Sequence, residues 1–210
     1  GFAQKPITFA YMPGIEDPFM RMIEKGAAAK AKELGAKLIV GEYPKAWGPE
    51  IQVPILEALV ARGGFDFLIV VPTSTEALKA PLKKISDKGI PMITTDTYIG
   101  DGDYTKPGIN FPLAYIGTDN ERGGYEVGKR LAEMVGKRGK VYMNTTNPDV
   151  SSVSGRRDGF LRAMKEYPNI TVVGIDYNLD VQETAQRQTA AVLQANPDLK
   201  GIFGTNLFSA

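Results

Sequence analysis

The chain repeats one unit: an apolar strand that ends on a polar residue, then a helix, then another strand. The clearest instance is the run 89–96, in which the apolar residues of a predicted strand lead directly to Asp96. Open α/β sheets bind ligands beyond the carboxyl ends of their strands. Asp96 and the polar residues at corresponding positions are therefore the first candidates for a functional site.

The first half of the chain alternates strands and helices in strict order. Asp17 followed by Pro18 predicts a helix start with a side-chain cap and a preset first residue. The continuous apolar strand 67–71 is typical of a parallel sheet covered on both faces, and Pro81 predicts the start of a third helix. The predicted strands cover 7–12, 37–41, 67–71 and 90–96, and the stripe of the first helix comprises Phe19, Ile23, Ala27, Ala31 and Leu34.

The second half repeats this rhythm after an interruption. Residues 98–112 are rich in Gly, Asp and Pro and predict a loop, which leads into a short strand at 113–117. Helices are then expected over 119–135, 154–167 and 181–195, and strands over 140–144, 171–176 and 201–205. The predicted fold is α/β, with two Rossmann-like lobes of parallel sheets flanked by helices, over 1–116 and 117–210. Because no helix follows the apolar strand 201–205, the second lobe is predicted to be incomplete.

Composition excludes several classes of function. The 25 basic and 24 acidic residues are nearly balanced and form no basic run, so a nucleic-acid partner is not expected. The chain has no Cys and no His, which removes thiol nucleophiles, imidazole bases and zinc sites of those residues. Gly123, Gly124 and Gly128 lack the spacing of a dinucleotide fingerprint, and no phosphate-loop pattern occurs. We therefore expect no cofactor and no metal.

Five motifs, in order along the chain, carry a resemblance to a known family. They cover the residues 15–20 (IEDPFM), 90–96 (IPMITTD), 115–124 (YIGTDNERGG), 155–160 (GRRDGF) and 201–206 (GIFGTN). Together they resemble the ribose-type sugar-binding proteins of bacterial ABC importers, the type I periplasmic binding proteins, which are related to the effector domains of lac-repressor-type regulators. Members of that family are markedly longer, so the resemblance also implies that this chain is truncated at its carboxyl end.

The resemblance implies a receptor that closes two lobes around a monosaccharide or sugar alcohol and presents the closed form to a membrane permease. A sugar needs carboxylates and amides around its hydroxyl rim and aromatic or Met surface against its C–H faces. The positions that match the family's ligand-contacting segments are Asp17, Phe19, Met20, Asp96, Thr97, Ser154, Arg156 and Asn206.

Four of the positions depart from the ribose pattern. Thr97 and Ser154 stand where an Arg is expected, Met20 replaces a second Phe, and Leu207 follows Asn206 where Asp is usual. The ligand is thus not expected to be bound as ribose is bound. A different pentose, a hexose and a sugar alcohol all remain open.

Simpler interpretations stand beside these. Asp17 could be only a helix cap, Phe19 and Met20 could belong to the core, and Trp47 could pack in its loop or cover a sugar. A lac-repressor-type regulator is the alternative function and would need a DNA-binding domain before the first strand. A sugar-modifying enzyme would need a carboxylate pair such as Asp17 with Asp96.

The expected location follows from the resemblance. We expect a periplasmic protein, or one secreted and tethered to the membrane of a Gram-positive host, that is monomeric at full length. Residues 1–4 (GFAQ) place small residues two apart, as before a signal-peptidase cut or in a cloning remnant.

Overall fold

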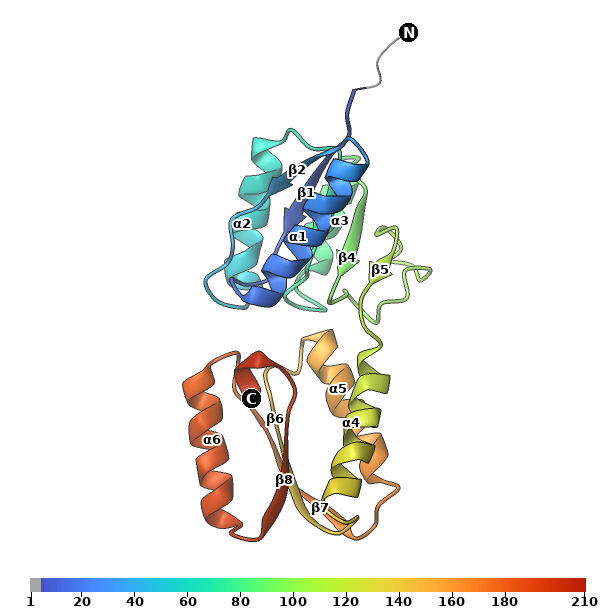
Figure 1. The fold of residues 1–210 in the computed structure, drawn as a ribbon. Coiled ribbons are helices and arrows are strands. Elements are labelled where there is room, and N and C mark those ends of the chain that lie inside the picture. Colours follow the sequence, from blue (N-terminus) through green and yellow to red (C-terminus); the bar gives the residue numbers. More distant parts are fainter. Residues whose placement is uncertain (1–4) are drawn as a thin grey trace. The chain divides into compact units, whose positions relative to one another are not determined.

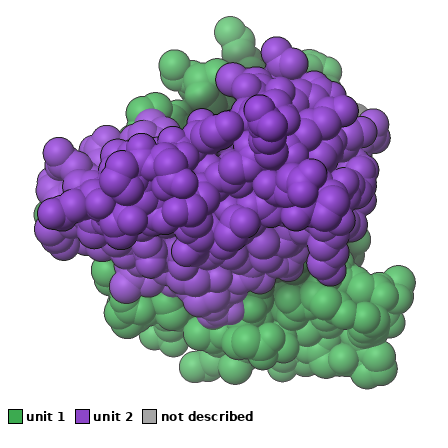
Figure 2. Space-filling view, turned by 90° about the horizontal axis from the view of Figure 1, so that it is seen from below, with its two compact units in different colours: residues 1–117 green, residues 118–210 purple. Residues whose placement is uncertain are grey.

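The computed structural model describes residues 5–210, so the start considered above, 1–4, lies outside the described residues. The chain divides into two compact units, which Figure 2 distinguishes by colour. Unit 1 ends at Gly117 and unit 2 begins at Thr118. Each unit has its own sheet and its own apolar core, and each is described by itself.

Unit 1 is a five-stranded parallel sheet in the order β2-β1-β3-β4-β5. The parallel pairing confirms the fold class expected from strict alternation. The strands are β1 (Thr8–Met12), β2 (Lys37–Val40), β3 (Phe67–Val70), β4 (Met92–Thr95) and β5 (Tyr115–Ile116), and the helices are α1 (Pro18–Glu33), α2 (Pro49–Arg62) and α3 (Lys79–Asp87).

The alternation of side chains along β1 explains how the helices cover this sheet. Met12 belongs to the buried cluster that also contains Leu56 of α2 and Leu82 of α3. The neighbouring Tyr11 points to the opposite face, where its hydroxyl donates to the backbone carbonyl of Met20 in α1. Thus α2 and α3 cover one face of the sheet and α1 covers the other (Figure 1).

Two local predictions in unit 1 were wrong. The buried residues of α1 are Met20 and Ala31, whereas Phe19 and Leu34, both expected in the apolar stripe, are exposed. One residue is about 100° around a helix, so a stripe that starts at Met20 turns Phe19 away from the core. In addition, α3 begins at Lys79, which places Pro81 third rather than first. Proline is tolerated there because the N–H groups of the first turn have no partner within the helix.

Unit 2 is a three-stranded parallel sheet in the order β7-β6-β8. Figure 1 shows α6 on one side of it and α4 and α5 on the other. The edge strand β8 carries Ile202, which is 41% exposed. The elements are α4 (Asn120–Met134), β6 (Gly139–Thr145), α5 (Ser151–Met164), β7 (Ile170–Tyr177), α6 (Gln182–Ala195), β8 (Leu199–Gly204) and the 3-10 turn η1 (Leu207–Ser209).

Helices α4 and α5 approach so closely that their backbones touch. A Cβ atom on Gly124 would lie 2.0 Å from the carbonyl oxygen of Arg156, and one on Gly159 would lie 1.8 Å from that of Glu121. Gly128 also faces α5, where its Cβ would lie 2.8 Å from Ala163. Only glycine leaves room for this crossing, and the crossing places the start of α4 beside Arg156.

None of the helices within residues 5–210 is long and apolar enough to cross a membrane.

Candidate functional site

The carboxyl edge of the sheet in unit 1 brings two of the predicted carboxylates into one neighbourhood. Asp17 follows β1 and Asp96 follows β4, and both strands run parallel in the same sheet. Burial is the main cause that raises the pKa of the Tyr11 hydroxyl, and the nearby charges of Asp96 and Asp17 raise it further. Both carboxylates therefore lie near enough to this hydroxyl to affect it, as do Tyr43 and Glu24.

Asp17 is the N-cap of α1, as the sequence predicts. Its Oδ1 accepts a hydrogen bond of 2.7 Å from the N–H of Met20, and Pro18 is the first helical residue. Burial raises the pKa of Asp17 above its usual value, although the N–H groups of Met20 and Phe19 counteract part of this rise. The Asp17 carboxylate thus caps the start of α1.

This environment predicts a pH-dependent effect of Asp17→Asn. Because the folded-state pKa of Asp17 is raised, the contribution of this group to stability is present below its unfolded pKa and is lost as pH rises through the folded pKa. Asn caps a helix as well as Asp does but does not ionise. We expect the difference in melting temperature, variant minus wild type, to increase from about pH 3 to about pH 7 in scanning calorimetry. A constant or decreasing difference would contradict the assigned environment.

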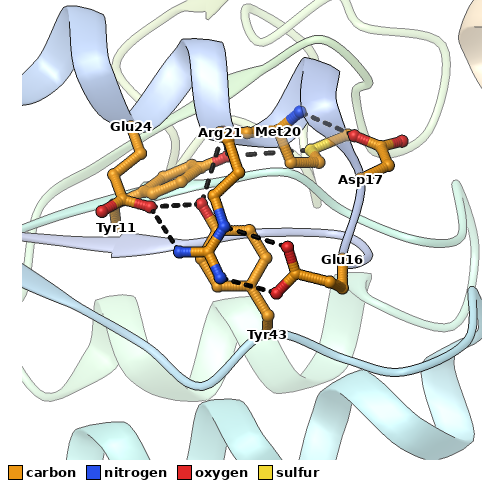
Figure 3. A network of polar contacts seen from close by, with 7 residues as sticks. All are labelled: Tyr11, Glu16, Asp17, Met20, Arg21, Glu24 and Tyr43. Atoms are coloured by element: carbon orange, nitrogen blue, oxygen red, sulfur yellow. Dashed lines mark hydrogen bonds and ion pairs between the residues drawn. The ribbon is translucent and has the colours of Figure 1, made fainter.

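Phe19 and Met20, predicted as alternative ligand contacts, have opposite surroundings. The Phe19 ring is 53% exposed, whereas Met20 is 2% exposed. The Met20 sulfur accepts a hydrogen bond from the Tyr11 hydroxyl beneath the first turn of α1 (Figure 3). The Met20 side chain thus supports the turn from the core, whereas the Phe19 side chain faces outward. A ligand contact at either residue stays a prediction.

A polar network missed by the sequence interpretation holds this first turn in place (Figure 3). The Arg21 guanidinium lies between the carboxylates of Glu16 and Glu24 and stacks on the ring of Tyr43, 3.6 Å from its centre. The Tyr43 hydroxyl donates to Glu24 at 2.5 Å. Tyr43 lies in the loop after β2, so the network ties two neighbouring loops of the carboxyl edge together.

Asp96 has an unusual backbone and Thr97 has a buried side chain. Asp96 has a positive φ of 65°, which is uncommon for a residue other than Gly. Thr97 is 1% exposed, and its hydroxyl donates to the carbonyl of Pro72 at 2.6 Å. Thr97 thus joins the loop after β4 to the loop after β3, and a ligand contact at this residue stays a prediction.

Gln52 of α2 is a second residue missed by the sequence interpretation. It is fully buried, and its amide donates to the carbonyls of Pro13 and Val71 and accepts from both the N–H and the hydroxyl of Thr73. The Trp47 indole N–H donates to the Thr73 carbonyl at 2.9 Å, so Trp47 joins the loop before α2 to the loop after β3. The only sequence signal for Gln52 was a polar residue in an otherwise apolar helix face.

Arg156 lies at the carboxyl edge of the sheet in unit 2. Its Nε donates to Asn120 Oδ1 at 2.9 Å, and its Nη1 donates to the carbonyl oxygen of Thr205 at 2.8 Å. Its other N–H groups make no hydrogen bond within the part of the chain that the structure describes, so they remain as donors. Asn120, at the start of α4, orients this guanidinium and was not predicted.

Asn206 is brought next to Arg156 through its neighbour Thr205. The Asn206 Oδ1 accepts hydrogen bonds from the N–H of Phe208 and from the hydroxyl of Ser209, both at 3.1 Å. The Asn206 oxygen is therefore already engaged within its own turn. Ser154, in the first turn of α5, donates its hydroxyl to the carbonyl of Pro148 in the preceding loop.

A buried network that includes the amides of Asn144 and Asn178 is connected to Asn206 through Ser209. The Asn178 side chain, which follows β7, donates to Asn144 Oδ1 at 2.6 Å and to the Ser209 hydroxyl at 2.9 Å. Ser209 in turn donates to Asn206. A side chain of β6 is thus joined to side chains that follow β7 and β8. Burial raises the pKa of Tyr142, also in β6, to about 12.

Within residues 5–210 no group of three or more His, Cys, Asp or Glu side chains could hold a metal ion. The polar groups described above are carboxylate acceptors in unit 1 and N–H donors in unit 2, and both kinds can form hydrogen bonds with hydroxyl groups.

Comparison with known proteins identifies the family. The model of the periplasmic binding protein domain matches residues 10–210. The chain belongs to this family of periplasmic binding proteins. A solved structure of an ABC transporter solute-binding protein from Agrobacterium vitis, bound with alpha-D-tagatopyranose, is 42% identical with a TM-score of 0.93 and covers 97% of this chain and 68% of that chain.

Curated relatives of this family member are import binding proteins. The ribose import binding protein RbsB of Haemophilus influenzae is 27% identical over 97% of this chain and 65% of its own length. The D-apiose import binding protein of Actinobacillus succinogenes is 23% identical over 98% of this chain and 63% of its own length. The chain thus spans somewhat less than two thirds of these relatives.

Proposed function

We propose that the complete protein is the substrate-binding receptor of a bacterial ABC importer and binds a monosaccharide or a sugar alcohol. The observation that carries this proposal is the polar pattern of the two carboxyl edges. Unit 1 offers the carboxylates of Asp17 and Asp96 as acceptors. Unit 2 offers the N–H groups of Arg156 and Asn206 as donors. Each sugar hydroxyl can donate to one kind of group and accept from the other.

Relatives of this chain support a sugar as the ligand. Besides the tagatose-bound protein, a periplasmic solute-binding protein from Actinobacillus succinogenes with bound D-allose is 31% identical with a TM-score of 0.80. The exposed ring of Phe19 gives this chain a surface for the C–H face of such a ligand. Ser154 and Thr97 stand where the ribose pattern has Arg, and their hydroxyls donate to the carbonyls of Pro148 and Pro72. The ribose pattern is therefore not reproduced, and a hexose or a polyol fits the proposal as well as a pentose.

The proposal includes binding without turnover, a periplasmic location and a membrane permease as partner. The family match and the names of the relatives support these points. The Asp17 carboxylate serves as a helix cap, which favours a binding role over acid–base chemistry.

A thermal-shift screen of the full-length protein against pentoses, hexoses and polyols, tagatose included, tests the proposal. A ligand that binds only the folded state stabilises it by about 2.7 kcal/mol at about 100 times its Kd, so one or a few sugars should raise the melting temperature by several degrees. Calorimetry and product analysis then follow for each hit. A flat screen would exclude a sugar ligand, and chemical conversion of the sugar would exclude a receptor.

A further inference from the structure

Asp96 sits at the centre of a rare backbone turn. Its φ is 65°, and the N–H of Thr97 donates across it to the carbonyl of Thr95 at 2.7 Å. A hydrogen bond between residues two apart, around a central residue of positive φ, defines the strained form of the γ-turn. Strain of this kind persists only where surrounding groups impose it, and it gathers at functional sites.

Two hydrogen bonds fix Asp96 from strand β5. The Asp96 N–H donates to the carbonyl of Ile116 at 3.0 Å and continues the pairing of β4 with β5. The Tyr115 hydroxyl donates to the Asp96 carbonyl at 3.0 Å. Without this bond, the peptide group between Asp96 and Thr97 could rotate back towards an extended strand. The Tyr115 hydroxyl therefore holds this peptide group in the orientation that the turn requires.

Tyr98 and Gly117 restrict where the Tyr115 side chain can lie. Its ring packs edge-on against Tyr98, with the ring centres 5.2 Å apart. A Cβ atom on Gly117 would lie 2.1 Å from the Tyr115 hydroxyl oxygen. Gly117 therefore provides the space that the hydroxyl occupies when it reaches Asp96.

We propose that Tyr115 is a positioning residue for sugar recognition: its hydroxyl holds the γ-turn at Asp96, so that the carboxylate is oriented before the ligand arrives. The proposal rests on the proposed function, since Asp96 is taken as a ligand contact. Tyr115 touches no ligand in this scheme. It acts through the backbone of Asp96 and lowers the ordering cost that binding would otherwise carry.

The test is Tyr115→Phe in the full-length protein, measured by calorimetry with the best sugar of the screen. The loss of one neutral hydrogen bond should weaken affinity about 3- to 10-fold. The same change in an Asp96→Ala background should have no further effect, because the residue it positions is gone. Equal losses in both backgrounds would overturn the proposal.

Tyr104→Phe is the matched control, because it also removes one Tyr hydroxyl, which bonds at 2.6 Å to the hydroxyl of Thr94 in β4. It should leave affinity unchanged. A second measurement needs no sugar: amide exchange of Thr97 should become faster in Tyr115→Phe than in Tyr104→Phe, and equal exchange in the two variants would also overturn the proposal. A protein that binds no sugar but shows this exchange pattern would defeat the proposed function and leave the turn mechanism supported.

Discussion

Replacing Gly124 with Ala is expected to lower the free energy of unfolding by about 3 kcal/mol, the upper end for overpacking a well-packed contact. The new Cβ would lie 2.0 Å from the carbonyl oxygen and 2.6 Å from the carbonyl carbon of Arg156. Backbone atoms cannot rotate away as a side chain can, so α4 and α5 must separate. Chemical denaturation of the full-length protein, followed by circular dichroism, measures the loss.

Gly123 is a matched control one residue away. It lies in the same helix, and a Cβ atom there would meet nothing within 4 Å. Gly123→Ala should therefore raise stability by about 0.5–1 kcal/mol, the usual gain of Ala over Gly inside a helix. Gly159→Ala, whose Cβ would lie 1.8 Å from the Glu121 carbonyl oxygen, should behave like Gly124→Ala. Similar effects at Gly123 and Gly124 would refute the close crossing.

Asp96→Ala and Asp96→Gly should weaken sugar affinity alike, by about 1.5–3 kcal/mol for each hydrogen bond that the carboxylate accepts. Their stabilities should differ. At the positive φ of 65° a Cβ atom is unfavourable by about 1–2 kcal/mol, and Gly has none. We expect Asp96→Gly to be the more stable variant of the two. Calorimetric titration measures the affinities, and denaturation of the sugar-free variants measures the stabilities.

The comparison separates ligand binding from folding. If Asp96 mainly stabilised the fold, both variants would lose stability and bind sugar as well as their folded fraction allows. Unchanged affinity in both folded variants would remove Asp96 from the ligand contacts. Equal stability of the two would show that the turn at this position is unstrained.

Much of the fold could be predicted because it depends on local patterns. Continuous apolar runs such as 67–71 identify buried parallel strands, and the Asp17-Pro18 pair marks the start of α1. Which side chains of a helix point to the core was harder to predict. The apolar residues near the start of α1 admit two stripes, one starting at Phe19 and one at Met20, and only the contact of Met20 with Tyr11 selects the second.

The sequence could predict which polar residues stand at the strand ends, but not their hydrogen-bond partners. Strand ends point to Asp96 and Asn206, yet nothing in the sequence indicates that the Asn206 oxygen is already used by Phe208 and Ser209. In the sequence, the spacing of Gly124 and Gly128 only excludes a dinucleotide-binding motif. The structure shows that these glycines pack α4 against α5.

Sequence alone was sufficient for the alternation of strands and helices, the parallel sheets, the polar strand ends and the resemblance to periplasmic binding proteins, because each depends on residues close together in the chain. The tertiary structure was needed to show that Phe19 faces outward, that Tyr115 bonds to Asp96, and that Arg156 bonds to Asn120 and Thr205. Those contacts join residues far apart in sequence, and their geometry follows from how the elements pack rather than from any local preference.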